Sequence, residues 1–389
     1  MTETKPSRGL GSILPFVLVL FAITDIGLRL LPARVLAFRS WEALSRYPAP
    51  GAPLEANGYF ASSRTRGDMV NLLGMAWLRP HPVRLRSEEF KTDRFGFRNL
   101  ESDIVRGPIT VIATGSSFTV SLGGSDQSTF PAQIAALADR GVYNAGGMVP
   151  ATRVIDSTMS RFGMTSGTVV HELLEVNEPP PPDVLNRSIP CDTTSGPSAR
   201  AICQFEQRID QFVAFSPLSA LLLRLHWTVS PGAAIYRLQN GDTIILRPSL
   251  LTTSSAPRPT TTAVQRLRLM ADECRDRHLR FILVLVPNKE TIYGPLLEKP
   301  SMSTTKADDY LERLERDVRA SGIEVVNTAP LLRAFATAHL SDREYVYYFD
   351  DTHWNACGIA IAARAVTAVL NEGAAGPPPM TSSLCAIPD

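Results

Sequence analysis

The chain has 389 residues, of which 44% are hydrophobic and 20% charged, a composition typical of a folded protein with a sizeable core. Its 39 Lys and Arg residues are nearly balanced by 38 Asp and Glu residues. Because no net positive field exists to attract a phosphate backbone, the composition excludes a nucleic-acid-binding protein from the first hypotheses.

The most apolar segment lies near the start of the chain. Ile13 to Ile23 reads ILPFVLVLFAI without a charge, and leucines extend the run beyond Asp25. A bilayer core needs about 20 mostly apolar residues, and Gly11 to Leu31 supplies that length. We therefore predict an N-terminal transmembrane anchor over residues 1–32. A cleaved signal peptide and a buried helix are the alternatives, although residues 24–26 lack a small-x-small cleavage site.

The rest of the chain divides by composition. Residues 33–58 are rich in Arg, Ala and Pro, which indicates a juxtamembrane linker. A single folded domain is predicted over residues 59–371, and within it residues 178–262 are too long for a simple connection, which indicates an inserted cap. Residues 372–389 are rich in Gly, Pro and Ser and are predicted to form a flexible tail.

Short apolar segments alternate with amphipathic ones through the predicted domain. Strands are predicted at residues 109–114, 142–144, 168–174, 281–286 and 323–326, and helices at residues 129–139, 151–162, 263–277, 306–320 and 355–370. This alternation is typical of a parallel sheet covered by helices on both faces. The predicted fold class is therefore α/β, a doubly wound, flavodoxin-like parallel sheet with an inserted cap segment and an N-terminal transmembrane helix.

The cysteine and histidine patterns give little sign of a metal. Cys191 and Cys203 lie close together and would close a short disulfide in an oxidising compartment. Cys274, Cys357 and Cys385 are scattered without a CxxC pair, and we interpret them as residues packed in apolar surroundings. The six histidines have no metal-like spacing, so neither a metal nor another cofactor is predicted.

A serine follows the first predicted strand of the sheet, in the segment Gly115 to Phe118. Ligands bind at the carboxyl ends of strands in doubly wound sheets, and a serine hydroxyl becomes a nucleophile when an imidazole oriented by a carboxylate takes its proton. His353 is the histidine in a dense polar and aromatic cluster, directly after Asp350 and Asp351. The sequence therefore predicts Ser117 and His353 as nucleophile and base, although an aspartate there could instead cap the following helix.

Two further polar residues lie on the third predicted strand. His171 and Glu172 alternate with apolar neighbours. We interpret them as a satisfied polar pair at a strand end, because buried polar side chains are normally hydrogen-bonded.

Together these motifs resemble the SGNH (GDSL-like) hydrolase superfamily, and within it the alginate O-acetyltransferase (AlgX/AlgJ-like) branch, which carries an Asp-x-His-Trp block. The matching segments are Gly115 to Phe118, Asn144 to Gly147 and Asp351 to Trp354, with Thr92 to Asn99 and Val286 to Tyr293 as further similarities. Ser116 stands where the GDSL motif has Asp, and the serine precedes the Asp-x-His-Trp block. The resemblance spans residues 92–370 by the order of these motifs.

The resemblance implies catalytic roles for three residues. Ser117 attacks an ester carbonyl, His353 acts as general base and then acid, and Asp351 orients the imidazole. Asp350 is the rival orienter, because many members of the superfamily carry Asp-x-x-His.

Residues around this triad are implied to bind the substrate. The backbone amides of Ser117 and Gly146, together with Asn177, are the expected oxyanion donors, and a turn residue is the alternative role for Asn177. Trp354 is expected to stack on a sugar ring, with core packing as its alternative.

The resemblance also implies a function and a location. The expected protein is a membrane-anchored serine O-acetyltransferase that acts on a polysaccharide through an acyl-serine intermediate. Its expected partners are an acetyl donor, a polysaccharide acceptor and a membrane-bound O-acyltransferase, and its expected location is the inner membrane, single-pass, with the catalytic domain in the periplasm. A carbohydrate or lipid esterase and a non-catalytic polysaccharide-binding assembly subunit are the alternatives.

Overall fold

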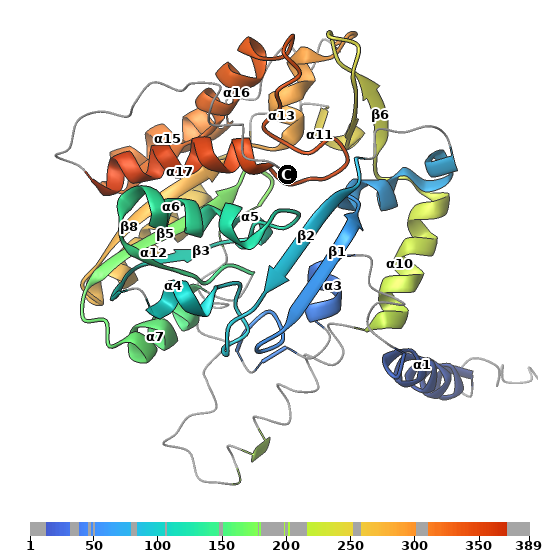
Figure 1. Cartoon of the computed structure of the whole chain (residues 1–389), viewed down its shortest axis with the longest axis horizontal. Coiled ribbons are helices and arrows are strands. Elements are labelled where there is room, and N and C mark those ends of the chain that lie inside the picture. Colours follow the sequence, from blue (N-terminus) through green and yellow to red (C-terminus); the bar gives the residue numbers. More distant parts are fainter. Residues whose placement is uncertain are drawn as a thin grey trace, which may run out of the picture.

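The structure is a computed structural model, and its centre is a parallel sheet (Figure 1). It describes residues 13–31, 39–45, 48–49, 51–78, 84–105, 107–147, 151–177, 179, 198, 201–202, 216–251, 258–300 and 310–371. The five strands are β3 (Ile109–Thr114), β4 (Gly141–Asn144), β5 (Gly167–Leu174), β8 (Leu279–Val286) and β9 (Glu324–Asn327), in the order β4-β3-β5-β8-β9. The winding reverses between β3 and β5, and such a switch point is where doubly wound sheets bind ligands.

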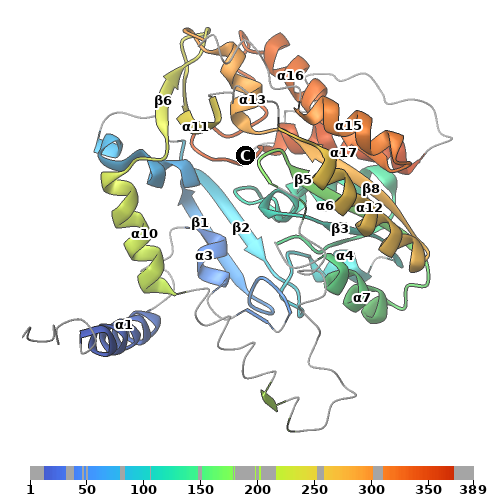
Figure 2. The ribbon, with the colours of Figure 1, turned by 180° about the vertical axis from the view of Figure 1, so that it is seen from behind.

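Helices cover both faces of this sheet, as Figures 1 and 2 show from opposite sides. One face carries α6 (Phe130–Ala138), α16 (Ala329–Ala338) and α17 (Ala356–Leu370), and the other carries α7 (Ala151–Phe162), α12 (Thr261–Asp276) and α15 (Tyr310–Ala320). Because successive side chains of a strand point to opposite faces, Val111 packs in the first layer and Ile112 in the second. The predicted doubly wound α/β architecture is confirmed.

An antiparallel hairpin that the sequence did not indicate lies beside the sheet. It consists of β1 (Tyr59–Thr65) and β2 (Arg86–Lys91), which are joined through the 3-10 helix η1 (Asp68–Leu78). Phe60 and Phe90 of the hairpin pack with Val120, which ends the short helix α5 (Ser117–Val120). The hairpin is thereby fixed against the segment that carries the predicted nucleophile.

Part of the predicted cap, residues 216–251, is described. It contains α10 (Pro217–Val229), the hairpin of β6 (Ala234–Arg237) and β7 (Thr243–Leu246), and α11 (Pro248–Leu251). The amide of Ile245 in β7 donates a hydrogen bond to the Phe349 carbonyl at 2.9 Å. This part of the segment therefore packs on the loop that precedes His353.

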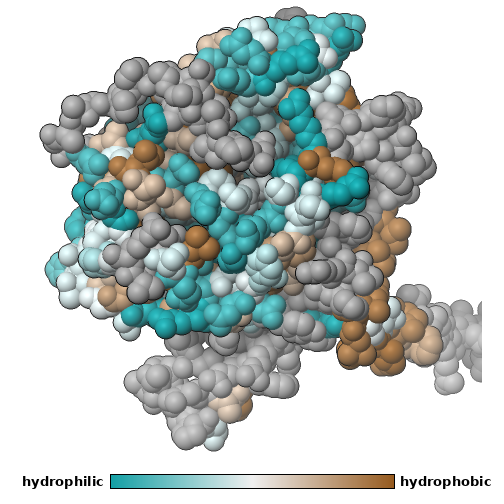
Figure 3. Space-filling view, viewed as in Figure 1, coloured by the Kyte–Doolittle hydropathy of each residue, from teal (hydrophilic) through white to brown (hydrophobic). Residues whose placement is uncertain are grey.

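The N-terminal helix α1 (Ile13–Arg29) has many exposed apolar side chains, and Figure 3 shows them as a hydrophobic patch that continues over α10. Asp25 of this helix accepts hydrogen bonds from the Ser216 hydroxyl at 2.6 Å and the Leu218 amide at 3.1 Å, and it pairs with Arg29. Among the described residues, no helix is long and apolar enough to cross a membrane. The predicted transmembrane helix is therefore not found in residues 13–31, the part of its range that is described, and the second half of α1 instead carries a buried ion pair that packs on the domain.

Shorter elements complete the described structure: α3 (Ser40–Leu44), α4 (Glu101–Val105), η2 (Asp126–Ser128), α13 (Lys289–Tyr293) and η3 (Gly294–Leu296).

The cysteine predictions are partly confirmed. Cys274 is buried, as predicted, and carries a free thiol. Cys357 is buried but disulfide-bonded, which corrects its interpretation as a residue held only by apolar packing. The predicted Cys191–Cys203 bridge, Cys385 and the tail over residues 372–389 lie outside the described residues. Residues 33–38, 46–47 and 50 of the predicted linker lie outside them too, but its described part packs on the domain, because Ala43, Leu44 and Leu54 share a core cluster with the hairpin.

Candidate active site

The turn between β3 and α5 presents Ser117 at the carboxyl end of the sheet. Gly115 has φ of 145°, and a Cβ there would lie 2.5 Å from the Thr119 hydroxyl and 2.7 Å from a Glu172 oxygen, so only glycine fits. The Ser116 hydroxyl caps α5 by accepting the Phe118 amide at 3.2 Å. Ser117 is the first residue of this helix and is partly exposed.

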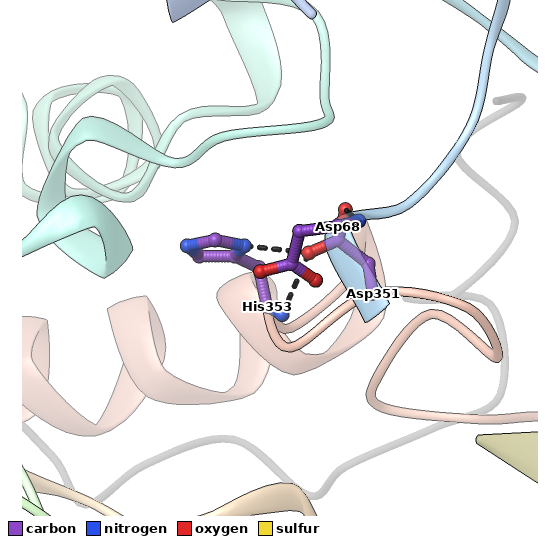
Figure 4. A group of neighbouring side chains, drawn as sticks. All are labelled: Asp68, Asp351 and His353. Carbon is purple, nitrogen blue, oxygen red and sulfur yellow. Dashed lines mark hydrogen bonds and ion pairs between the residues drawn. The ribbon is translucent and has the colours of Figure 1, made fainter. Parts of the chain in front are cut away.

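The structure brings the three predicted catalytic residues into one hydrogen-bonded line. The Ser117 Oγ lies 2.8 Å from His353 Nε2, and His353 Nδ1 lies 2.6 Å from Asp351 Oδ1. In the tautomer that this geometry favours, Nδ1 donates to the carboxylate and Nε2 accepts the serine proton. Figure 4 shows the imidazole with one nitrogen directed at Asp351 and the other facing away from the carboxylates.

Asp351, and not its neighbour Asp350, contacts the imidazole. Asp350 accepts hydrogen bonds from Arg86 at 3.0 Å and from the Gly67 amide at 2.8 Å. The same guanidinium donates to Asp351 Oδ2 at 2.8 Å, on the carboxylate oxygen that His353 leaves open. Arg86 therefore fixes both carboxylates, and only Asp351 lies behind the ring.

Each member of the His353–Asp351 pair stabilises the charged form of the other. Burial disfavours both charges, but the attraction of His353 and its hydrogen bond, followed by the charges of Arg86 and Arg39, hold the pKa of Asp351 well below its usual range. Burial likewise disfavours the imidazolium, yet the charge and hydrogen bond of Asp351 raise the pKa of His353 above its usual value. The site thus favours proton uptake by the imidazole, which a general base requires.

A third carboxylate, Asp68 at the start of η1, lies beside this pair (Figure 4). Asp68, Asp351 and His353 each offer an atom within 4.8 Å of the others, which is a spacing that a metal ion could use. Asp68 is already held by the amide and hydroxyl of Thr352, at 2.7 and 2.5 Å, while the imidazole bonds Ser117 and Asp351. Because these bonds use the atoms that a metal would need, the donor set fits a serine triad better than a metal centre.

The carboxylate of Glu172 lies directly beneath the nucleophile turn. Its Oε2 accepts the Ser116 amide at 2.7 Å, the Ser116 hydroxyl at 2.8 Å and the Thr119 hydroxyl at 3.2 Å. Burial raises its pKa despite these bonds. His171 instead bonds the Thr114 hydroxyl at 2.9 Å, and burial lowers its pKa to about 4. Glu172 therefore belongs to the support of the nucleophile, whereas His171 is a satisfied core side chain.

A buried lysine supports the loop that carries the triad acid. Lys289 at the start of α13 donates to the main-chain carbonyls of Phe349 at 2.8 Å and Asp351 at 3.1 Å. Its side chain is fully buried, which lowers its pKa to about 8. The bonds fix the backbone on either side of Asp350 and so the position of the carboxylate behind His353.

The expected oxyanion donors differ in their availability. The Ser117 amide, at the first position of α5, makes no hydrogen bond to any other residue that the structure describes. The Gly146 amide donates to the Asn144 side chain at 3.1 Å, so it is not a free donor in this arrangement. Asn177 lies in the turn after β5, where its amide bonds the Leu174 carbonyl at 2.8 Å, which matches the alternative role of a turn residue.

Trp354 does not face a substrate. Its side chain is 0% exposed and packs against Phe118 and Phe130, with ring centroids 5.4 and 5.3 Å away. The expectation that it stacks on a sugar is corrected, because the ring fills the core between α5, α6 and α17 and thereby positions the backbone of His353.

Comparisons with known proteins bear on the region that contains the base. Residues 246–382 match the family described as "SGNH hydrolase-like domain, acetyltransferase AlgX". The chain resembles the AlgX branch of the SGNH proteins. The match covers less than half of the chain and includes Asp351 and His353, while Ser117 lies outside it. The resemblance that the sequence motifs predicted is confirmed.

Two solved structures are among those that the chain matches. A protein assigned to the lipolytic G-D-S-L family from Desulfitobacterium hafniense DCB-2 is 13% identical with a TM-score of 0.32, over 66% of this chain and 97% of its own. A protein assigned as an SGNH hydrolase from Slackia heliotrinireducens is 11% identical with a TM-score of 0.32, over 68% of this chain and 100% of its own. A comparison with curated protein sequences gave no match.

Sequence reasoning missed four residues that support the candidate site: Asp68, Arg86, Glu172 and Lys289. Glu172 stood out on a predicted strand and Lys289 within a motif, but neither pattern indicated a contact with the triad. Arg86 and Asp68 belong to the hairpin region, which lacked an apolar signal. Their roles depend on contacts with Asp350, Asp351 and Thr352 across more than half of the chain.

Proposed function

We propose that this protein is a serine O-acetyltransferase that acts on a polysaccharide through an acyl-serine intermediate. The observation that carries the proposal is the continuous hydrogen-bonded line from the Ser117 hydroxyl through His353 to Asp351. Its AlgX-like region supports chemistry of the acetyltransferase or esterase type. A hydrogen-bonded nucleophile, base and orienter is the arrangement that acyl transfer requires.

In the proposed reaction, His353 Nε2 takes the proton of Ser117 Oγ as the oxygen attacks the acetyl carbonyl. The Ser117 amide stabilises the negative oxygen of the tetrahedral intermediate. His353 then returns the proton to the leaving oxygen of the donor, and an acetyl-serine ester remains. A sugar hydroxyl next gives its proton to His353 Nε2 as its oxygen attacks the acetyl carbonyl of the acyl-serine. His353 then returns this proton to Ser117 Oγ as the acetyl–Oγ bond breaks, which releases the acetylated sugar and restores the free serine.

Asp351 and Arg86 prepare this proton transfer. The buried carboxylate stabilises the imidazolium that forms twice in each cycle, and Arg86, together with His353, lowers the pKa of that carboxylate. Because Arg86 contacts Asp351 on the oxygen away from the ring, it supplies charge without blocking the base.

We further propose that the catalytic domain faces the periplasm at the inner membrane, where a membrane-bound O-acyltransferase supplies the acetyl group. The disulfide at Cys357 supports an oxidising compartment. The apolar side chains of α1, such as Phe16, Leu18 and Ile23 at 68%, 59% and 62% exposure, support attachment to a membrane or a membrane protein.

The test is a comparison of acetyl transfer with hydrolysis. The purified protein is given 4-nitrophenyl acetate with and without a polysaccharide acceptor, and both nitrophenol release and acetyl groups on the polymer are measured. The proposal expects acetylated polymer in wild type and none in Ser117→Ala. Nitrophenol release that depends on Ser117, with no acetylated polymer from any acceptor, would instead favour the esterase alternative.

A further inference from the structure

A hollow of about 410 Å³ lies where the β1–β2 hairpin meets the loop after α5 and the segment before His353. Pockets for small ligands commonly measure about 300–1,000 Å³, so the volume suits a sugar residue. Its wall includes Tyr59, Arg86, Gly124 and Tyr348, none of which is a member of the triad. Figure 3 shows mainly hydrophilic residues over the hairpin, in contrast to the apolar patch of α1 and α10.

The hollow offers hydroxyl groups and aromatic rings. The hydroxyls of Tyr59, Ser63 and Ser87 make no hydrogen bond to another residue within the described part of the chain. Tyr59 is 57% exposed, and Tyr348 lies at the same hollow with its ring beneath Arg86 at 3.9 Å. Hydroxyl donors and acceptors beside aromatic faces match the hydroxyl edges and apolar C–H faces of a pyranose.

The charges at the hollow argue against an anionic ligand. Arg86 is the only Lys or Arg in its described wall, and its guanidinium already bonds Asp350, Asp351 and the Gly123 carbonyl. Glu88 is likewise held internally by the Ser40 hydroxyl at 2.6 Å. The described wall has tyrosine rings, alanines and glycines but no long aliphatic side chain, which suits the C–H face of a sugar better than a lipid chain. Glu89, the other carboxylate of the wall, pairs with Lys91 at 2.7 Å, so the hollow favours a neutral polyhydroxylated ligand over a charged one.

Two residues that line the hollow, Arg86 and Tyr348, are hydrogen-bonded to members of the triad. Arg86 donates to Asp351, and the Tyr348 amide donates to the carbonyl of His353 at 3.3 Å. Gly123 and Gly124 follow Ser117 after one short helix, and a Cβ at Gly124 would lie 3.0 Å from the Ser128 hydroxyl, so small residues keep this wall open. A sugar held here lies beside the catalytic machinery.

We propose that this hollow is a subsite for a neutral sugar residue of the acceptor polysaccharide. That the bound glycan is the acceptor of the acetyl group rests on the proposed function, whereas the binding of a neutral glycan in the hollow does not. The subsite holds a residue of the chain next to the sugar whose hydroxyl meets the acyl-serine, and so keeps the polymer in register with Ser117.

The test measures binding without catalysis. Cellotetraose, mannotetraose and chitotetraose are titrated into Ser117→Ala protein and followed by saturation-transfer NMR and calorimetry. In the same background, Ala61→Trp fills the hollow from its wall and Tyr59→Ala removes an exposed ring. Ala136→Trp, on the exposed side of α6 and outside the hollow, is the matched control.

The proposal expects at least one tetrasaccharide to bind, and the Kd to rise about tenfold in Ala61→Trp and in Tyr59→Ala but not in Ala136→Trp. Binding that is equal in all variants, or binding of none of the three sugars, would overturn it. Failure of the proposed function is a separate result, since that would appear as absent acetylation by wild type while the binding data stand.

Discussion

Arg86 is the cation that ties the two neighbouring aspartates together, and its removal is the most informative perturbation of stability. Its guanidinium bonds Asp350 and Asp351 at 3.0 and 2.8 Å, and the three side chains are only 7%, 1% and 3% exposed. Arg86→Met leaves buried carboxylates without their cation. Breaking a buried pair by removal of one partner typically costs about 3–5 kcal/mol, so we expect the free energy of unfolding to fall by about that amount.

The measurement is urea unfolding at pH 7, followed by circular dichroism. Arg64→Met is the matched control, because Arg64 lies on the same hairpin but is exposed, and its loss is expected to change stability by no more than about 0.5 kcal/mol. Arg86→Lys keeps the charge but lacks the planar fork that spans two carboxylates, so an intermediate loss is expected.

The effect of Arg86→Met should also depend on pH. In wild type the pKa of Asp351 lies well below its usual value, so its contribution to stability is present above about pH 4 and is lost as pH falls through the native pKa. The difference between wild type and variant should therefore narrow in acid. If Arg86→Met were as stable at pH 7 as Arg64→Met, the account of the buried ion cluster would be wrong.

Three further experiments test the roles of the aspartates, of His353 and of Lys289. Asp351→Asn should lower kcat for 4-nitrophenyl acetate by about 10⁴, whereas Asp350→Asn should lower it far less, since Asp350 does not touch the imidazole; equal losses would contradict the assignment. Because the pKa of His353 is raised, kcat/KM should fall as pH drops with a midpoint above about 6.5, and an acid limb centred lower would argue against His353 as the base. Since Lys289 has its pKa lowered to about 8, stability should rise with pH between about 8 and 10.5, by at most about 3 kcal/mol; a Lys289→Met variant that keeps this slope would exclude Lys289 as its source.

The sheet could be predicted from the sequence because its strands are buried on both faces. Segments such as ITVIAT and FILVLV are continuous apolar runs, and their predicted limits lie within two residues of β3 and β8. The β1–β2 hairpin gave no such signal. In β2, the buried side alternates Arg86, Glu88 and Phe90, so two of three inward positions are charged and are satisfied only by partners elsewhere in the chain.

The triad residues could be proposed from motifs, but their surroundings could not. Sequence spacing left both Asp350 and Asp351 as possible orienters. The structure distinguishes them, because Asp351 bonds the His353 ring whereas Asp350 bonds the distant Gly67 amide. The burial of Trp354 could not be predicted for the same reason. Its neighbour Phe118 comes from a distant segment of the chain, and the contact between the two rings places Trp354 in the core, where it cannot stack on a sugar.

The contacts at the end of the N-terminal apolar run could not be predicted either. Asp25 and Arg29 pair with each other, and Asp25 accepts a hydrogen bond from the Ser216 hydroxyl, which lies 191 residues further along the chain. The composition of the run alone does not indicate such a contact.

The central claim is that Ser117 is a nucleophile activated by His353. The direct measurement is covalent labelling with a fluorophosphonate probe, followed by peptide mass spectrometry. The account predicts a single adduct on the peptide that contains Ser117, no adduct in Ser117→Ala, and greatly slowed labelling in His353→Ala. Absence of labelling in folded wild-type protein, or an adduct at another residue that persists in Ser117→Ala, would contradict it.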